Sequence, residues 1–364
     1  MTVSVHLDAV DGCARATTVT TDRGSYPTPA FMPVGTRGAV KHLTSADLEA
    51  LGSDFVLCNT YHLMLRPGAD VVGDLGGLHR FMDWNGHVLT DSGGYQVFSL
   101  EPKVDDDGAV FRSTYDGSLH RLTPETAVRT QELLGADIQM VLDICPGLPA
   151  PKEVLQAAVD RTAAWAARAK ATHRRPDQSL FGIVQGGTHE GLRAESARRT
   201  AEIGFDGYGV GGLSVGESRA EMLPALAAAM AELPADVPRY LMGVGDPAGM
   251  VEAVALGIDM FDCVLPSRLA RHGTLLTAAG RLNLTNARYA TDEAPPDPSC
   301  PCSTCARWSR GYLRHLLQVR EPSAGRLLTV HNVRWVIDLV RRMRAAIVEG
   351  TFESLRREVL AVWG

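Results

Sequence analysis

The chain has 364 residues, of which 45% are hydrophobic and 21% charged, so it can bury a full core and exceeds the usual size of one domain. A formal net charge of −6 argues against a generally basic nucleic-acid binder, and seven cysteines, an odd number, argue against a disulfide framework. The chain does not open with a basic region and an apolar run, and no stretch of about 18 apolar residues follows, so we expect a cytoplasmic protein without a membrane span.

Eight short apolar runs are separated by segments with amphipathic, helix-like spacing. Several segments begin with a capping side chain followed by Pro or an acidic residue, as at Thr44, Thr123 and Asp246. Strand and helix repeated eight times is typical of an α/β fold, the (β/α)8 barrel of the TIM type. The predicted strands are residues 30–34, 54–59, 87–91, 138–143, 180–185, 208–212, 239–244 and 259–266.

Polar residues and glycines gather where the predicted strands end. A (β/α)8 barrel builds its active site at the C-terminal ends of the strands, so these residues are candidates for one site. Each of them could also be a simple turn former or helix cap, because Asp, Asn and Gly are favoured there. The residues are Asn59, Asp91, Asp143, Gln185, Gly211, Gly212, Gly243, Gly245 and Asp262.

An insertion at about residues 99–122 interrupts the repeat. Turn signals flank a short apolar run that begins at Ala109, which predicts a β-hairpin beside the mouth of the barrel. After Pro266 the chain changes character, with a possible extra strand, a Pro-rich linker and a long amphipathic helix from about Val333. We therefore expect a barrel core over residues 1–280 and a mainly helical appendage over residues 281–364 that packs on it.

A cysteine cluster lies at the start of the predicted appendage. Cys300, Cys302 and Cys305 supply three sulfurs within six residues, and His331 supplies an imidazole. These four ligands complete a tetrahedral shell and leave no open position, so the sequence predicts one structural Zn²⁺ per chain. Spacing alone leaves two alternatives: His315 as the fourth ligand, or three incidental thiols.

The C-terminal segment is basic although the chain is acidic. Residues 300–364 contain eleven arginines and five acidic residues, a net charge of +6, so the remainder carries −12. A basic appendage on an acidic body is typical of a surface that meets RNA or phosphate. The alternative is a solvated, arginine-rich helix face.

Four motifs and the cysteine cluster resemble those of the tRNA-guanine transglycosylases, in consistent order from about Phe31 to Phe352. The closest resemblance is to the bacterial branch. It implies a zinc-containing barrel enzyme, a pentosyltransferase of queuosine synthesis, which exchanges guanine 34 in tRNAs with G-U-N anticodons for 7-aminomethyl-7-deazaguanine (preQ1). The motifs are Asp91-Ser-Gly-Gly-Tyr-Gln-Val-Phe, Phe181-Gly-Ile-Val-Gln-Gly-Gly, Gly211-Gly-Leu-Ser-Val-Gly-Glu and Asp259-Met-Phe-Asp-Cys-Val-Leu-Pro-Ser-Arg.

The chemistry of base exchange agrees with two of these residues. Displacement of a base from ribose passes through an oxocarbenium-like state, which suits one carboxylate that attacks the sugar and another that handles the proton. The resemblance implies that Asp262 is the nucleophile and Asp91 the general acid/base, acting by double displacement through a covalent enzyme–RNA intermediate. Both residues end predicted strands, where a barrel would bring them together.

The resemblance also implies the residues that contact base, RNA and a second subunit. Asp143, Gln185, Gly212 and the Leu213 carbonyl would bind the base edge, while Tyr95 and Met242 would sandwich the ring; by pattern alone Met242 reads as a core residue. Bulk at Val215 would restrict the 7-substituent to a small one. Arg268 and Arg271 would contact the anticodon loop.

Three side chains recur at helical spacing near the cysteine cluster: Trp308, Tyr312 and His315. The resemblance places this face in a homodimer interface near Lys41 and His62. A helix face covered by the core of the same chain explains the spacing equally well.

Two departures from the family pattern concern base discrimination and the charge near the RNA. Ile144 stands where the family usually has Glu, and Asp246 stands where it usually has Lys. Three alternatives fit part of the sequence: a non-catalytic tRNA-binding subunit of this fold, a transglycosylase for another 7-deazaguanine or another tRNA position, and a metal-dependent barrel hydrolase. The presence of both carboxylates argues against a non-catalytic subunit, and the lack of a His-x-His pair or carboxylate cluster at a strand end argues against a hydrolase. The relatives that act on another tRNA position carry further C-terminal domains, so with the chain ending at Gly364 we expect the wobble-position enzyme. The identity of the 7-deazaguanine stays open.

Overall fold

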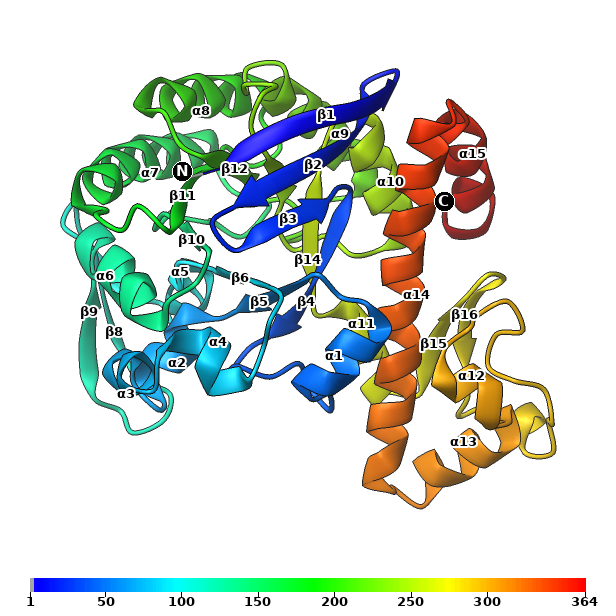
Figure 1. Ribbon diagram of the computed structural model, residues 1–364. Coiled ribbons are helices and arrows are strands. Elements are labelled where there is room, and N and C mark those ends of the chain that lie inside the picture. The colour runs from blue at the N-terminus through cyan, green and yellow to red at the C-terminus, as the bar shows by residue number, and fades with distance from the viewer. Residues whose placement is uncertain (1–2) are drawn as a thin grey trace.

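The protein, described here over residues 3–364 by a computed structural model, is built around a closed barrel of eight parallel strands (Figure 1). The strands follow one another around the barrel in chain order, and pairing of β6 with β10 and of β14 with β4 completes the ring. Each strand lies within, or overlaps closely with, one of the eight apolar runs, which confirms the predicted (β/α)8 fold. The strands are β4 (Ala30–Gly35), β5 (Phe55–Cys58), β6 (His87–Thr90), β10 (Ile138–Met140), β11 (Ser179–Val184), β12 (Gly207–Val210), β13 (Arg239–Leu241) and β14 (Met260–Cys263).

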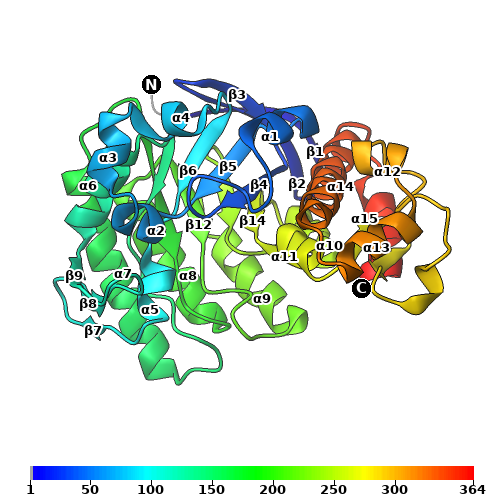
Figure 2. The same ribbon diagram turned by 90° about the horizontal axis from the view of Figure 1, so that it is seen from below.

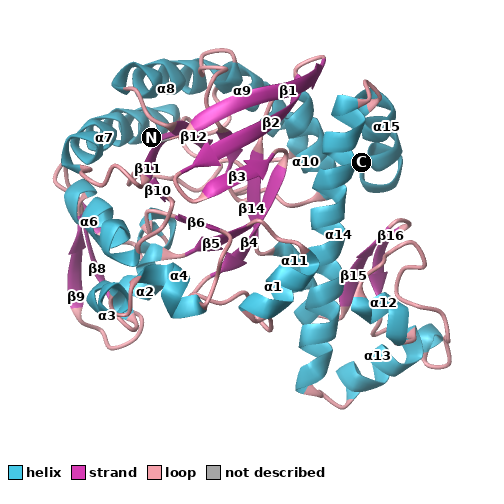
Figure 3. Ribbon diagram, viewed as in Figure 1, coloured by secondary structure: helices cyan, strands magenta, loops and turns pink. Residues whose placement is uncertain are grey.

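Helices surround the barrel, as Figure 3 shows by colour. Thr44 and Thr123 form capping boxes, and Asp246 accepts a hydrogen bond from the Gly249 N–H at 2.8 Å, so the three predicted helix starts are confirmed. The helices that follow the barrel strands are α1 (Ser45–Leu51), α2 (Thr60–Leu65), α3 (Ala69–Asp74), α4 (Gly77–Met82), α5 (Gly94–Phe98), α6 (Pro124–Leu134), α7 (Lys152–Thr172), α8 (Glu190–Ile203), α9 (Arg219–Met230), α10 (Pro247–Ala255) and α11 (Leu265–Arg271).

A three-stranded antiparallel sheet at the N-terminus was not predicted. It consists of β1 (Ser4–Asp11), β2 (Ala14–Thr21) and β3 (Gly24–Pro27). Arg15 on β2 forms a buried ion pair with Asp259, the residue before β14, and Arg23 pairs with Asp137, the residue before β10. The sheet therefore covers the N-terminal end of the barrel and leaves the C-terminal end free for a site.

The insertion forms a small antiparallel sheet. It contains the predicted hairpin, β8 (Ala109–Arg112) and β9 (Leu119–Leu122), together with a short third strand, β7 (Lys103–Val104). The inward side chains of Phe111 and Leu122 join an apolar cluster with Trp165 of α7. The excursion is thus packed against the barrel helices.

The elements after α11 lie on one side of the barrel (Figure 2). Val336, Val340 and Met343 of α14 share one apolar cluster with the barrel strands, whereas the start of α14 packs on α13. The predicted boundary between residues 280 and 281 lies inside β16, and the division into two domains stays a prediction. The elements are β15 (Thr274–Thr277), β16 (Gly280–Asn283), η1 (Ala287–Tyr289), α12 (Ser303–Arg307), α13 (Arg310–Gln318), α14 (Pro322–Val348) and α15 (Phe352–Trp363).

Two expectations for this region were wrong. The long helix begins at Pro322 and not near Val333, since Pro fits the first turn of a helix. Trp308 does not share a helix with Tyr312: it ends α12 with extended backbone, and Ser309 caps the start of α13 by accepting from the Tyr312 N–H at 3.2 Å. Trp308 consequently packs against an apolar cluster, whereas Tyr312 and His315 are exposed. Among residues 3–364, no helix is both long enough and apolar enough to span a bilayer.

Candidate active site

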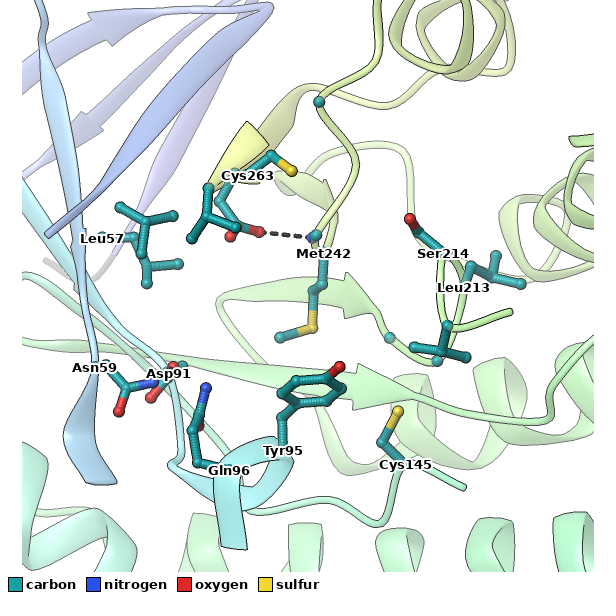
Figure 4. A pocket seen from close by; sticks show the side chains of 18 of the residues that line it. Leu57, Asn59, Asp91, Tyr95, Gln96, Cys145, Leu213, Ser214, Met242 and Cys263 are labelled. Carbon is teal, nitrogen blue, oxygen red and sulfur yellow. Dashed lines mark hydrogen bonds between the residues drawn. The ribbon is translucent and has the colours of Figure 1, made fainter. Parts of the chain in front are cut away.

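A cavity of about 490 Å³ opens at the C-terminal ends of the barrel strands (Figure 4). Its walls come from the loops that follow the strands, which is where the sequence places its strand-end polar residues. Arg271 does not line it, although it lies on the same helix as Arg268. The predicted site residues that do line it are Asp91, Tyr95, Asp143, Gln185, Gly212, Leu213, Met242, Asp262 and Arg268.

Asp262 reaches the cavity from the end of β14. Its Oδ1 accepts hydrogen bonds from the Tyr240 hydroxyl at 2.5 Å and from the Gly243 N–H at 2.7 Å. Burial raises the pKa of the Asp262 carboxyl, while these two donors oppose the increase. Within residues 3–364 no donor bonds Oδ2, so this oxygen keeps its lone pairs for a reacting atom.

Asp91 follows β6 and is held by a different set of donors. Its Oδ1 accepts from the Thr60 and Gly93 N–H groups, each at 3.0 Å, and its Oδ2 accepts from the Asn59 amide at 2.6 Å. Burial raises the pKa of Asp91 to about 7, and repulsion from the Asp262 carboxylate adds to the increase. At neutral pH this carboxyl can therefore both release and accept a proton, the property of a general acid/base.

A third carboxyl, Asp143, forms a pair with Gln185 in the wall of the same cavity. The Gln185 amide donates to the Asp143 Oδ2 at 2.5 Å, and both side chains are buried. Burial raises the pKa of Asp143 to about 6. The Gln185 Oε1 has no hydrogen-bond partner within residues 3–364, which is costly for a buried polar atom. The pair thus offers unsatisfied polar groups to a ligand.

Tyr95 and Met242 extend toward one another across the cavity in Figure 4. The Tyr95 ring is 61% exposed, although it is a large aromatic side chain at the start of α5. An aromatic face opposite a polarisable thioether is suited to hold a flat ring between them. The structure therefore places Met242 at the site and not simply in the core.

Only glycine fits at position 212 in the wall of the cavity, next to Gln185. The Gly212 backbone has φ of +63°, and a Cβ there would overlap the Gln185 Oε1. Leu213, Ser214 and Val215 continue this wall, and Glu217 accepts hydrogen bonds from the Ser214 and Val215 N–H groups. The loop after β12 is consequently fixed by its own backbone contacts.

Ile144 and Asp246, the two residues that depart from the family pattern, have different surroundings. The Ile144 N–H donates to the Thr162 hydroxyl at 3.0 Å, and the Ile144 side chain packs against an apolar cluster. Asp246 lines the cavity, but it also caps α10 and lies 3.9 Å from Arg219. Neither residue bonds Asp91 or Asp262.

Sequence reasoning missed Tyr240 and Arg281, two polar residues among those that line the cavity. Tyr240 bonds Asp262, and a signal was available, because the predicted strand 239–244 places residues 240 and 242 on the same side; β13 itself ends at Leu241. Arg281 lines the cavity from β16, outside the barrel repeat. Arg268 and Arg281 give the rim positive charge, and the exposed Arg271 extends it along α11.

The cysteine cluster lies apart from the cavity. The possible ligand atoms of Cys300, Cys302, Cys305 and His331 lie within 4.8 Å of one another. The His331 Nδ1 is 3.1 Å from the Cys305 sulfur and 3.6 Å from the Cys302 sulfur, and tetrahedral bonds of about 2.0–2.3 Å give edges of similar length. The His331 Nε2 meets the Leu276 carbonyl at 2.7 Å, which leaves Nδ1 free to bind a metal. The four residues can hold a metal ion, and His315 is not among them.

Comparisons with known proteins cover nearly the whole chain. The family model described as "Queuine tRNA-ribosyltransferase" matches residues 11–364. The queuine tRNA-ribosyltransferase of Herpetosiphon aurantiacus is 51% identical over 357 residues, which is 98% of this chain and 91% of the relative. That of Syntrophobacter fumaroxidans is 51% identical over 346 residues, which is 94% of this chain and 93% of the relative. That of Moorella thermoacetica is 50% identical over 344 residues, which is 94% of this chain and 92% of the relative.

Proposed function

Because this chain belongs to the queuine tRNA-ribosyltransferase family, we propose that it replaces guanine 34 in tRNAs with G-U-N anticodons by 7-aminomethyl-7-deazaguanine. The chain is a tRNA-guanine transglycosylase, a pentosyltransferase of queuosine synthesis. The mechanism we infer is double displacement through a covalent enzyme–RNA intermediate. One observation carries it: two carboxyls with separate hydrogen-bond donors, Asp91 and Asp262, line the same cavity.

In the first displacement, Asp262 forms a bond to C1′ of the ribose as the bond from C1′ to the guanine N9 breaks. Its Oδ2 is the attacking atom, since Oδ1 is held by Tyr240 and Gly243. Asp91 donates its proton to the departing guanine, so that the base leaves neutral. The ribose is then linked to Asp262 as an ester, and Asp91 is a carboxylate.

In the second displacement, the incoming base occupies the place of guanine. Asp91 removes the proton from its N9, the base forms a bond to C1′, and the bond to Asp262 breaks. Asp91 regains the proton that it gave up, and Asp262 is again a carboxylate. No net proton is consumed, which is required when one base replaces another.

Recognition of the base rests on complementary donors and acceptors. The Asp143 carboxylate is suited to accept from N1–H and the 2-amino group of guanine, and Gln185 and Gly212 lie beside it. Tyr95 and Met242 would enclose the ring. The Leu213 carbonyl would accept from the ammonium of the 7-aminomethyl group.

The activity should depend on pH through both reacting carboxyls. Asp262 must be ionised to attack, and its raised pKa removes activity as the pH falls. Asp91 must carry a proton to release guanine, so its pKa of about 7 removes activity as the pH rises above 7. We expect a bell-shaped profile of kcat/KM for tRNA, with an alkaline limb that falls above about pH 7 and with both limits belonging to the coupled pair. A profile that stays flat through neutral pH would contradict the assignment.

Competition between bases tests the proposed substrate. Val215 lines the cavity, and its branched side chain would limit the size of a substituent at position 7. We expect 7-aminomethyl-7-deazaguanine to displace labelled guanine from tRNA at lower concentration than the 7-cyano analogue, and queuine to be excluded. Preference for the 7-cyano base would show that the Ile144 surroundings change the selectivity.

The cluster of Cys300, Cys302, Cys305 and His331 is proposed to hold one structural Zn²⁺. A bound zinc would supply a crosslink between the loop around α12 and the middle of α14. The far half of α14 packs on the barrel strands, so the crosslink would hold the appendage against the barrel. The metal would take no part in the chemistry, because four protein ligands leave no open position.

The protein is also proposed to bind the anticodon loop and to form a homodimer. Arg268 and Arg271 are exposed on α11 at the cavity rim, where a planar guanidinium can contact bases and phosphates. A tRNA substrate supports the predicted cytoplasmic location.

The proposed homodimer interface lies at α13. Tyr312 is 46% exposed on this helix, which supports a subunit interface there. His315 lies beside it, and Lys41 and His62 are further proposed residues of the interface. Trp308 packs against the apolar cluster beneath α13 and would therefore stabilise this helix without contacting the second subunit.

A further inference from the structure

Arg193 is a fully buried arginine behind the wall of the cavity. It lies in the first turns of α8 with an exposed fraction of 0% and is not among the lining residues. Within residues 3–364 no carboxylate forms an ion pair with its guanidinium. The charge is bound only by backbone carbonyls, those of Gly187 at 2.6 Å, Val184 at 3.1 Å, Gly211 at 2.6 Å and Gly212 at 2.9 Å.

Two of these carbonyls belong to the wall of the cavity. In a trans peptide the C=O of one residue and the N–H of the next point in opposite directions. Because the Gly211 and Gly212 carbonyls point at Arg193, the N–H groups of Gly212 and Leu213 point away from it, toward the cavity that these residues line. Neither N–H finds an acceptor within residues 3–364.

The arrangement resembles an anion hole with a cation fixed behind it. The guanidinium holds five N–H donors in one fixed plane, whereas an ammonium has three donors and no such plane. Burial lowers the pKa of Arg193 to about 10, so it remains charged at neutral pH. A buried charge without a carboxylate partner is unfavourable unless its donors are satisfied, and carbonyls accept from four of its five N–H donors here.

We propose that Arg193 is a positioning residue for base selectivity, which aims the Gly212 and Leu213 N–H groups at the 6-oxo oxygen of the base. This inference rests on the proposed function. In guanine the 6-oxo oxygen adjoins N1–H, and N1–H is the group that suits the Asp143 carboxylate. The Gln185 amide lies between Asp143 and Gly212, since it bonds the first and contacts the second. A base bound to Asp143 therefore presents its 6-oxo oxygen to these N–H groups.

The test compares guanine with 6-thioguanine as substrates for exchange into tRNA. The two bases share the N1–H and 2-amino donors and differ in the 6-position, where sulfur is a weak acceptor. Arg193→Met should raise the KM for guanine by about tenfold or more, because the N–H groups of Gly212 and Leu213 would no longer be aimed at the 6-oxo oxygen. The KM for 6-thioguanine should change by about threefold or less, because its sulfur depends little on these donors. The KM for tRNA should stay unchanged.

Arg15→Met is the matched control. Arg15 is also buried and also donates to backbone carbonyls, those of Ala235 and Val237, but it pairs with the Asp259 carboxylate as well and lies at the opposite end of the barrel. The Arg15→Met variant should be less stable than the unmodified enzyme but should keep the same ratio of KM values for guanine and 6-thioguanine. If Arg193→Met does not fold, Arg193→Lys keeps the charge without the planar fork and should still lose part of the preference.

The outcomes separate this inference from the proposed function. Absence of guanine exchange by the unmodified enzyme would refute the function itself. An active enzyme that does not distinguish the two bases, or Arg193 variants that keep the preference or weaken both bases equally, would overturn the role of Arg193 alone.

Discussion

Asp262→Asn should lower guanine exchange by about 10⁴-fold or more, since this change removes the group that forms the covalent bond. The amide oxygen can still accept from Tyr240 and Gly243, so the local structure should persist. The pKa of Asp262 is raised by burial, which means that the charged form is disfavoured and that a neutral amide should not destabilise the fold. Labelled guanine incorporation and a tRNA-binding assay measure the two effects.

Asp246→Asn makes the same chemical change at the same cavity and serves as the control. Asp246 caps α10 through the Gly249 N–H, and asparagine caps helices equally well. Exchange by this variant should stay within about threefold of the unmodified enzyme, because no covalent step uses the residue. Rapid exchange by Asp262→Asn would remove that residue from the role of nucleophile, and loss of tRNA binding would show a structural defect.

Cys302→Ser should remove the metal from the purified protein. Zinc binding through thiolates is part of the folding free energy of small metal sites, and loss of one of four ligands weakens it severely. We expect zinc to fall from one equivalent per chain to about a tenth or less, by elemental analysis. The barrel should remain folded, because its core is assembled from the strands and the far half of α14.

The control for this variant is Cys13→Ser, at an exposed cysteine outside the cluster. It should keep its full zinc content and thermal stability. Cys302→Ser should instead show a separate, earlier transition from the appendage in thermal unfolding. A retained equivalent of zinc in Cys302→Ser would refute the ligand assignment.

The barrel could be predicted because its strands are buried on both faces. Each therefore reads as a continuous apolar run, and the polar residue that ends it marks the active-site rim, as at Asp91 and Asp143. The N-terminal sheet gives a weaker signal. A register shift between Leu7 and Ala9 breaks the alternation of β1, and Leu7 and Val10 are exposed although they are apolar. Local pattern alone cannot detect such a strand.

Helix boundaries in the appendage show a second limit of pattern reasoning. The spacing of Trp308, Tyr312 and His315 fits one helix, yet the hydroxyl of Ser309 starts a new one between them. A capping hydrogen bond and a continuing helix compete for the same residues, and periodicity does not decide between them. The direction of the Trp308 side chain follows from this competition.

At the active site, the residue types that act on a substrate could be predicted, but the groups that hold them in place could not. Asp262 follows from its motif, whereas the Tyr240 hydroxyl that fixes its Oδ1 was missed. Arg193 lies in a helix with two other arginines, and by pattern it resembles a surface residue. Only the three-dimensional structure shows its guanidinium among four carbonyls.

The central claim is that Asp262 bonds covalently to the tRNA during base exchange. The most direct test is to trap the enzyme with its tRNA in the absence of a free base, and to locate the ribose-bearing peptide by mass spectrometry. We predict one adduct, on Asp262, which disappears when guanine is added. An adduct on another residue, or exchange without any adduct, would contradict the mechanism.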